Sequence, residues 1–270
     1  MTDHLQRALT LHSMHVQGDP LILPNAWDVA SARAVLAAGA QAVATTSAGV
    51  AWSLGHRDGN ELSRETALDA VRRITAAVPV PVTADIEGGY GDTSAEVART
   101  IAACIEAGVS GVNLEDTLRP VEEQEHRIAA ARRAADEAGI HLFINARIDT
   151  HRLGDVGGDH WFDETVTRAA AYARAGASGI FVLGALRADT IERLADRTTL
   201  PVNVAFGPGT LSISELAKAG ASRISAGSSI AEAAYSLAHQ WASSMLDSPD
   251  AAPAQPPALG WAAMNGLIRD

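Results

Sequence analysis

The residues best able to do chemistry are Asp85 and Glu87, which close a short apolar run and precede three glycines, Gly88, Gly89 and Gly91. If the run is a strand, side chains two residues apart point to the same face. Carboxylate oxygens on one face are the ligands that a hard divalent cation takes. A polar strand end followed by a flexible turn explains Asp-x-Glu about equally well, so the interpretation depends on other residues.

Three further charged residues follow apolar runs or lie in the loops between them. Glu115 ends the run Gly111–Glu115, and Arg147 follows the next run. The guanidinium fork of an arginine suits a substrate carboxylate, although Arg147 could equally pair with Glu115. Asp58 could reach a metal through water or cap the helix expected near Ser63, and its own residues favour the cap.

Small and neutral polar residues stand at other strand ends. Thr46, Ser47 and Ala48 would leave backbone N–H groups open to a carboxylate or phosphonate, or form an ordinary turn. Asn203 offers a neutral donor, or is a turn residue. Acids that converge at one end of a sheet repel each other unless a cation lies between them, so the sequence predicts a magnesium-type site.

A repeating unit must position these residues. Helical patterns that end in Ala-Gly precede short apolar runs, and two further runs follow proline-flanked turns. Eight strands result, each followed by a helix, which predicts an α/β fold of the (β/α)8 TIM-barrel type: residues 21–23, 42–45, 80–84, 111–115, 141–147, 179–183, 201–204 and 223–226. An open doubly wound sheet would usually carry a Gly-x-Gly-x-x-Gly turn after its first strand, and Pro24-Asn25-Ala26 stands there instead. Asn25 or Asp28 is expected to cap the following helix.

The composition changes near the end of the chain. We expect a catalytic barrel domain over residues 1–246, then a proline-rich linker and a C-terminal helical tail over residues 247–270. An apolar segment, Leu259 to Ile268, ends this tail. It must pack on its own barrel or on a neighbouring subunit.

Charge and cysteine content exclude several classes of protein. Lysine and arginine total 21 and acids 32, so the net charge of −11 argues against partners such as nucleic acid or an anionic membrane. It does not exclude an anionic substrate, because a metal can reverse the local field. The single cysteine, Cys104, lies in a helical pattern and is expected to be a buried thiol in a cytoplasmic protein. Neither a signal peptide nor a transmembrane run is expected.

Taken in order, these motifs resemble the isocitrate lyase/phosphoenolpyruvate mutase superfamily over residues 20–245. The residues that carry the resemblance are Thr46-Ser47-Ala48, Gly55-x-Arg57-Asp58, Asp85-x-Glu87-x-Gly89-Tyr90-Gly91, Asn113-Leu114-Glu115-Asp116 and Asn145-Ala146-Arg147. The resemblance implies a (β/α)8 barrel in a homodimer or homotetramer, often with a terminal helix exchanged between subunits. It also implies a lyase or mutase reaction through an enolate of a small 2-oxo or 2-hydroxy acid.

The resemblance assigns roles to the candidate residues. Mg2+, with Mn2+ as the alternative, would be held directly by Asp85 and through water by Asp58, Glu87 and Glu115. Substrate would be bound by Thr46, Ser47, Ala48, Arg147 and Asn203. The catalytic roles fall on Arg147, Asp58 and Glu115, with the metal and the arginine stabilising the developing oxyanion.

One departure from the family bears on the reaction. Lyases of the family carry a mobile Lys-Lys-Cys-Gly-His loop, and mutases a loop with lysine and asparagine, whereas Thr117–Glu122 here contains no cysteine, lysine or histidine. We therefore favour formation or cleavage of a C–C bond by a relative with a truncated loop. Phosphonopyruvate or carboxyphosphonoenolpyruvate mutase activity, or carboxylate binding without catalysis, is the alternative. Arg119 could replace the missing cation, although a solvated loop residue is favoured.

Overall fold

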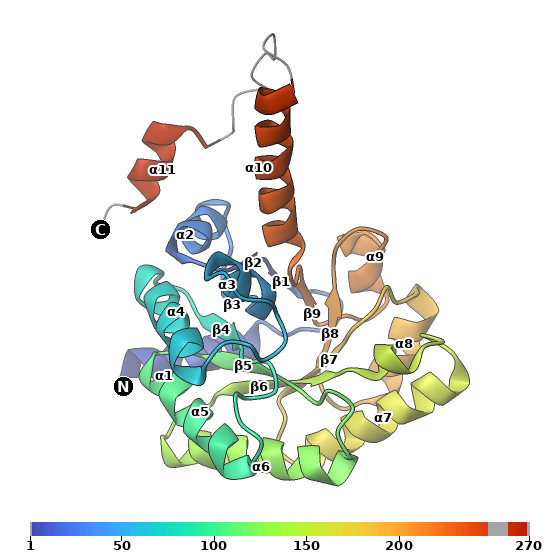
Figure 1. Ribbon diagram of the computed structural model, residues 1–270. Coiled ribbons are helices and arrows are strands. Elements are labelled where there is room, and N and C mark those ends of the chain that lie inside the picture. Colours follow the sequence, from blue (N-terminus) through green and yellow to red (C-terminus); the bar gives the residue numbers. More distant parts are fainter. Residues whose placement is uncertain (1, 248–258, 269–270) are drawn as a thin grey trace.

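A computed structural model describes residues 2–247 and 259–268. Its centre is a barrel-like sheet of parallel strands in the order β1-β9-β8-β7-β6-β5-β4-β3-β2, surrounded by helices (Figure 1). The strands are β1 Leu21–Leu23, β2 Asn25–Ala26, β3 Val43–Thr45, β4 Val82–Asp85, β5 Gly111–Glu115, β6 Phe143–Ile148, β7 Gly179–Val182, β8 Val202–Ala205 and β9 Arg223–Ser225. The helices are α1 Thr2–Ser13, α2 Val29–Ala37, α3 Ser47–Ser53, α4 Arg64–Ala77, α5 Ser94–Glu106, α6 Val121–Glu137, the 3-10 turn η1 Thr150–Leu153, α7 Asp159–Arg174, α8 Ala188–Arg197, α9 Ile213–Lys218, α10 Ser229–Asp247 and α11 Trp261–Ile268.

The predicted TIM-type barrel is confirmed, with one difference at its seam. The expected first strand is β1, which pairs with β9, and after Pro24 a further short strand, β2, pairs with β3 where a turn was expected. Asn25 lies in β2, where its Nδ2 donates to the Thr45 carbonyl (2.8 Å) and its Oδ1 accepts from the Ala226 amide (3.0 Å). Asn25 thus ties the two sides of the seam together, and Asp28 is the residue that caps α2.

Helix ends follow the local sequence. Five predicted Ala-Gly endings are confirmed, because in each an alanine C-cap is followed by a glycine at positive φ: Gly39, Gly108, Gly139, Gly176 and Gly220. At the opposite ends, reciprocal side-chain caps join Asp28 with Ser31, Thr93 with Glu96, and Ser212 with Glu215. The alternation of strand and helix is therefore encoded at both ends of the helices.

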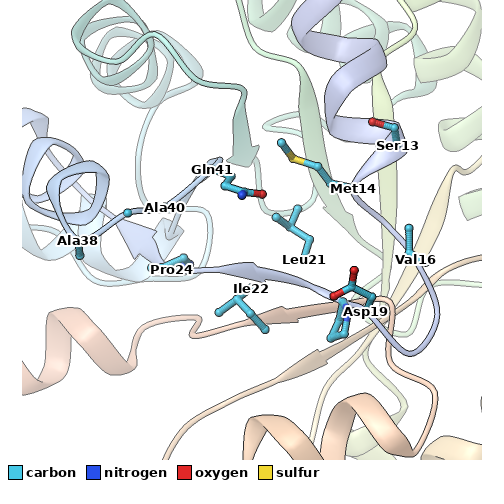
Figure 2. Close-up of a pocket in the computed structure, with 12 residues that line it drawn as sticks. Ser13, Met14, Val16, Asp19, Leu21, Ile22, Pro24, Ala38, Ala40 and Gln41 are labelled. Atoms are coloured by element: carbon cyan, nitrogen blue, oxygen red, sulfur yellow. The ribbon is translucent and has the colours of Figure 1, made fainter.

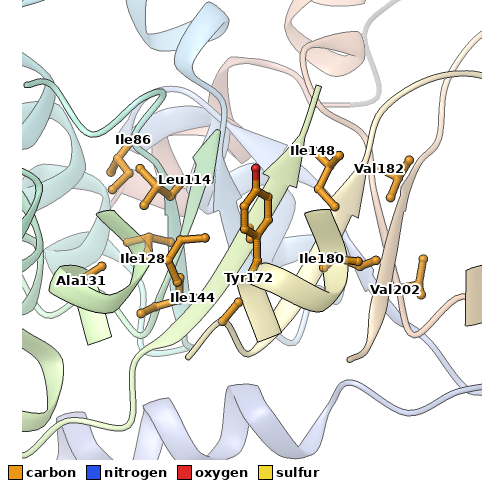
Figure 3. Close-up of a cluster of buried hydrophobic side chains, with 14 of the residues drawn as sticks. Ile86, Leu114, Ile128, Ala131, Ile144, Ile148, Tyr172, Ile180, Val182 and Val202 are labelled. Carbon is orange, nitrogen blue, oxygen red and sulfur yellow. The ribbon is translucent and has the colours of Figure 1, made fainter. Parts of the chain in front are cut away.

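The main core lies between the sheet and the surrounding helices. Figure 3 shows buried aliphatic side chains of neighbouring strands, including Ile144 and Ile180, beside Ile128 of α6 and Tyr172 of α7. Cys104 belongs to this core, and burial raises the pKa of its thiol to about 12, as expected for a structural cysteine. A smaller cluster that includes Leu21 and the Phe143 ring forms a separate part of the core.

The carboxyl-terminal helices differ from the barrel. Most of α10 is exposed, including the apolar side chains of Tyr235, Leu237, Met245 and Leu246, and Figure 1 shows the helix projecting away from the sheet. Helix α11 lies beside α2 of the same chain. The expected linker falls largely outside the described residues, so the division into two regions stays a prediction. Within residues 2–247 and 259–268, no helix is both long and apolar enough to cross a bilayer.

Candidate active site at the carboxyl ends of the strands

The candidate residues meet at the carboxyl ends of β4, β5 and β6, and this end of the barrel is called the mouth below. Asp85 ends β4 and Glu115 ends β5, and in the strand register Asp85 pairs with Asn113 and Glu115 pairs with Arg147. The side chains of Glu115 and Arg147 contact each other directly. In a parallel barrel this end of the strands is where active sites are found.

Asp85 is held by the beginning of α3. Its Oδ2 accepts from the amide and the hydroxyl of Ser47 at 3.3 and 3.1 Å, and its own amide donates to Thr45 Oγ1 at 2.9 Å. Thr46 is the N-cap of α3 but makes no side-chain cap, and Ala48 is buried in its first turn. The segment predicted to bind substrate therefore positions Asp85, and its role toward a substrate stays a prediction.

Glu87 is buried and lies in strained backbone. Its φ is 49°, and its Oε2 accepts a hydrogen bond from the amide of Asn60, itself at φ 62°. Left-handed conformations at residues other than glycine cost energy and concentrate at functional sites. Burial raises the pKa of Glu87, and the charges of Asp58 and Asp85 raise it further.

Asp58 lies near the carboxylates and not at a helix end, so its interpretation as a cap is wrong. The N-cap of α4 is Ser63, whose Oγ accepts from the Thr66 amide at 3.1 Å. Partial burial raises the pKa of Asp58, Asp85 raises it further, and Ser47 lowers it. The loop after α3 thus brings a third acid toward Asp85.

Glu115 and Arg147 form a buried ion pair that also includes Asp149. Arg147 Nη1 lies 2.7 Å from Glu115 Oε2, and Arg147 Nε donates to Asp149 Oδ1 at 2.7 Å. Because one guanidinium serves two carboxylates, burial and the neighbouring acids still raise the pKa of Glu115, to about 8. The two carboxylates raise the pKa of Arg147 and keep it charged. The pairing of Arg147 with Glu115 that the sequence left open is therefore present.

Asn203 lies deeper in the barrel than the charged residues. Its Nδ2 donates to backbone carbonyls of β8 and β9 and to Ser225 Oγ, and its Oδ1 accepts from Asn145 Nδ2 at 3.0 Å. These contacts use its amide inside the barrel. Its assignment as a substrate-binding residue stays a prediction.

The turn after β5 is short and tightly held. Thr117 and Leu118 both have positive φ, 48° and 60°, and the Leu118 amide donates to Asp116 Oδ1 at 3.0 Å. Arg119 pairs with Glu123 of α6 at 3.1 Å and not with a residue of the mouth. The contacts of Arg119 thus agree with the favoured interpretation as a loop residue and give no support to the alternative, replacement of the missing loop cation.

Two buried groups near the site were not anticipated. Asp149 follows Arg147 by two residues, a spacing that could have suggested the pair. Arg223 interrupts the apolar run of β9, is fully buried and donates to Asn113 Oδ1 at 3.1 Å. A charged residue inside an apolar strand is the signal that could have identified it.

The carboxylates are coupled by charge more than by contact. Asp58, Asp85 and Glu87 form no ion pair in the part of the chain that the structure describes. Across those same residues, no three His, Cys, Asp or Glu side chains lie close enough together, as placed, to hold a metal. A separate pocket near the beginnings of β1 and β3 is lined by residues such as Ser13, Asp19 and Gln41, with none of the mouth residues among them (Figure 2).

Comparison of the sequence with known proteins identifies a family and several relatives. The phosphoenolpyruvate phosphomutase family model matches residues 11–246. An uncharacterized protein of Mycobacterium tuberculosis (strain H37Rv) is 37% identical over 220 residues, 82% of each chain. An oxaloacetate decarboxylase of Rhodopseudomonas palustris (strain CGA009) is 31% identical over 147 residues, 53% of this chain and 51% of its own length.

Solved structures with the same fold also match this chain. A protein of Burkholderia cenocepacia J2315, provisionally described as a phosphonomutase, has a TM-score of 0.84 and 41% identity over 90% of this chain and all of its own. A 2,3-dimethylmalate lyase has the same fold, with a TM-score of 0.84 and 24% identity over 97% of this chain and 94% of its own.

Proposed function

The chain belongs to the phosphoenolpyruvate phosphomutase family, as an enzyme of the isocitrate lyase/phosphoenolpyruvate mutase superfamily, and we propose that it is a Mg2+-dependent carbon–carbon lyase. Its substrate in this proposal is a small 2-oxo or 2-hydroxy carboxylate, and the reaction passes through an enolate. Oxaloacetate decarboxylase among its relatives supports a substrate of this size and charge.

One observation carries the proposal: three acids, Asp58, Asp85 and Glu87, share the mouth, and none of them forms an ion pair within the described residues. Burial raises the pKa of both Asp58 and Glu87, the charge of Asp85 raises both further, and neither acid is neutralised by an ion pair within the described residues. Such repulsion is relieved by a bound divalent cation. The donors are all carboxylate oxygens, which fits Mg2+ or Mn2+ and not a metal that prefers sulfur or imidazole ligands.

The resemblance to the superfamily assigns roles to these donors as metal ligands. Asp85 would hold Mg2+ directly, and Asp58, Glu87 and Glu115 would hold it through water. When bound, the ion supplies Lewis-acid stabilisation of oxyanion charge. Ser47 fixes the orientation of Asp85, while the hydrogen bond to Asn60 fixes that of Glu87.

Arg147 is the group that would bind the substrate carboxylate. Glu115 and Asp149 hold its guanidinium at the mouth from two sides, so little side-chain freedom remains to be lost on binding. Its charge would also favour the enolate oxygen as negative charge develops there. Within the described residues, Arg147 is the cation that pairs with an acid of the mouth, and a single such cation favours C–C chemistry over transfer of a phosphonyl group.

A turnover and proton-exchange assay tests the proposal. Pyruvate, oxaloacetate and 2-methylmalate-type acids are incubated with Mg2+ in D2O, and enolate exchange and cleavage are followed by NMR. We expect exchange or cleavage of at least one acid, loss of the signal with EDTA, and a decrease of about 10²–10³-fold in Asp85→Ala. Asp69→Ala, which removes an exposed acid of α4, should retain the activity. Equal signals from the wild type and Asp85→Ala would refute the lyase.

The short turn after β5 favours a second candidate, a carboxylate-binding protein without catalysis. Thr117–Glu122 brings no cysteine, lysine or histidine over the mouth. This candidate requires oxalate to bind with Mg2+, seen by calorimetry, while every acid of the exchange panel remains unchanged.

We also propose that the protein is a cytoplasmic homodimer or homotetramer. The exposed apolar side chains of α10, such as Leu237 and Met245, support an interface with a second copy. Truncation after Leu246 removes α11 and should lower the mass measured by light scattering. An unchanged mass would exclude the tail from assembly.

A further inference from the structure

A polar layer lies inside the barrel, beneath the charged mouth. The amide of Asn145 donates to Asn113 Oδ1 (2.9 Å) and to Asn203 Oδ1 (3.0 Å), so that β5, β6 and β8 are joined across the interior. Ser225 of β9 accepts from Asn203 at 3.1 Å. Barrel interiors are usually filled by branched apolar side chains, so a layer of amides at this depth requires an explanation.

Arg223 is the only cation in contact with this layer among residues 2–247 and 259–268. Its exposed fraction is 0%, and Nη2 donates to Asn113 Oδ1 at 3.1 Å. Its Nε and Nη1 have no hydrogen-bond partner within those residues, and it forms no ion pair there. A buried guanidinium without a paired anion is strongly unfavourable, so a nearby negative charge must offset part of its cost.

The strand register places a negative charge, Asp85, beside Asn113, the residue that Arg223 contacts. Arg223 reaches from β9 to Asn113, and Asn113 is the register partner of Asp85 on β4. The charge of Asp85 acts on Arg223 and opposes the lowering of its pKa, which burial brings to about 9. The guanidinium is therefore still charged at neutral pH and lies close to the least neutralised acids of the site.

The groups on the other side of Arg223 do not offset it. His15 lies nearby, and burial together with Arg223 lowers its pKa to about 3, so it is neutral. Its ring stacks on Phe143 at 3.8 Å, below the amide layer. Among the described residues, Asp85 is therefore the acid whose charge acts on Arg223.

We propose that Arg223 is a positioning residue of the metal site: a fixed internal positive charge that compensates Asp85 before a divalent cation binds and that fixes Asn113 next to it. The inference rests on the carboxylate site of the proposed function but not on its reaction. In the absence of metal, Arg223 reduces repulsion among the acids. Once a divalent cation binds, the same positive charge opposes it and weakens its affinity.

A double-mutant cycle without metal tests the first part. Urea unfolding in EDTA is measured for the wild type, Arg223→Met, Asp85→Asn and the double variant. Methionine keeps the buried stem and removes the charge. We expect the change in unfolding midpoint caused by Arg223→Met to be clearly more unfavourable with Asp85 present than with asparagine there. Additive effects would overturn the proposal.

Two further variants separate charge from packing. Arg223→Lys keeps the charge, so its effect on unfolding should depend far less on Asp85 than the effect of Arg223→Met does. Arg223→Gln, which removes the charge but keeps a hydrogen-bonding amide, replaces Arg223→Met in the cycle if that variant does not fold. Arg132→Met is the matched control, because Arg132 donates to the carbonyls of Gly176 and Leu142, away from the mouth. It should show no coupling to Asp85. Equal coupling in both would assign Arg223 a purely structural role.

Metal titration tests the second part. Calorimetry with Mg2+ should give a dissociation constant about three- to tenfold lower for Arg223→Met than for the wild type, because a like charge has been removed. An unchanged or higher constant would contradict the proposal. The cycle in EDTA uses neither metal nor substrate, so coupling can be present even if the proposed lyase activity fails.

Discussion

Two adjacent acids, Glu115 and Asp116, lie in regions of opposite character. Glu115 faces the mouth, where it shares Arg147 with another carboxylate and its pKa is raised. Asp116 faces α7, where its Oδ2 accepts from Arg168 Nη1 at 3.0 Å and from the Tyr172 hydroxyl at 2.7 Å. Its Oδ1 accepts from two backbone amides. One residue of sequence therefore separates an incompletely compensated acid from a fully hydrogen-bonded one.

This difference distinguishes buried charges that stabilise the fold from buried charges that lower its stability. A charge that is paired and hydrogen-bonded on every side, like Asp116, joins β5 to α7 and to the chain after β6. Acids whose pKa is raised by burial and by a neighbouring acid, like Asp58 and Glu87, lower the stability of the metal-free protein. Such residues are expected where binding of a ligand supplies the missing compensation.

The largest expected difference in stability between the two regions comes from neutral isosteres of Asp116 and Glu115. Asp116→Asn leaves Arg168 buried without its main partner, and we expect the free energy of unfolding to fall by about 3 kcal/mol. Glu115→Gln leaves Arg147 paired with Asp149 and removes one of the repelling acids. Because the pKa of Glu115 is raised, its charged form adds little stability at neutral pH, and the free energy of unfolding should change by about 1 kcal/mol or less. Urea unfolding in EDTA measures both.

One result of these unfolding measurements would contradict the contrast between Glu115 and Asp116. If Glu115→Gln is as destabilising as Asp116→Asn, both acids are structural and the mouth carries no stored repulsion. Glu164→Gln is a suitable control, because Glu164 also pairs with Arg168 but is partly exposed. It should cost less than Asp116→Asn.

The second test is the pH dependence of stability. Since the pKa of Glu115 is raised in the folded protein, the folded state holds more protons than the unfolded state between about pH 4.5 and 8. Metal-free stability should therefore fall as pH rises through this range, by about 1–2 kcal/mol between pH 5 and 8. Unfolding at several pH values in EDTA measures the slope, and Glu115→Gln should flatten it. A wild-type profile that is flat, or rises with pH, would show that Glu115 is fully compensated.

The fold was predictable because its signals are local. Ala-Gly endings such as Ala107-Gly108 mark helix ends, since glycine takes the left-handed conformation required there, and the apolar runs between them mark buried strands. The break at Pro24 was not predicted, because the pairing of β1 with β9 depends on contacts about 200 residues apart in sequence.

The site was predictable only in part. The spacing of Asp85 and Glu87 and the strand-end positions of Glu115 and Arg147 identified the mouth, because residue types at strand ends can be read directly. The partners could not be read in this way. Asp116 and Arg168 meet across 52 residues, and Arg223 reaches Asn113 across 110 residues, so only the closed barrel brings them together.

The smallest test removes a single hydrogen bond from each region. Tyr172→Phe deletes the hydroxyl that donates to the buried Asp116, and it should lower the free energy of unfolding by about 1–2 kcal/mol, because Asp116 is charged and cannot turn to water. Ser47→Ala deletes the hydroxyl that donates to the partly exposed Asp85, which keeps the Ser47 amide as a donor. Its cost should be about 0.5 kcal/mol. Thermal or urea unfolding in EDTA measures the loss of stability in Tyr172→Phe and in Ser47→Ala. A larger loss for Ser47→Ala would mean that Asp85 depends on this hydroxyl for its burial, and the mouth would then resemble the region of Asp116 more than a ligand site.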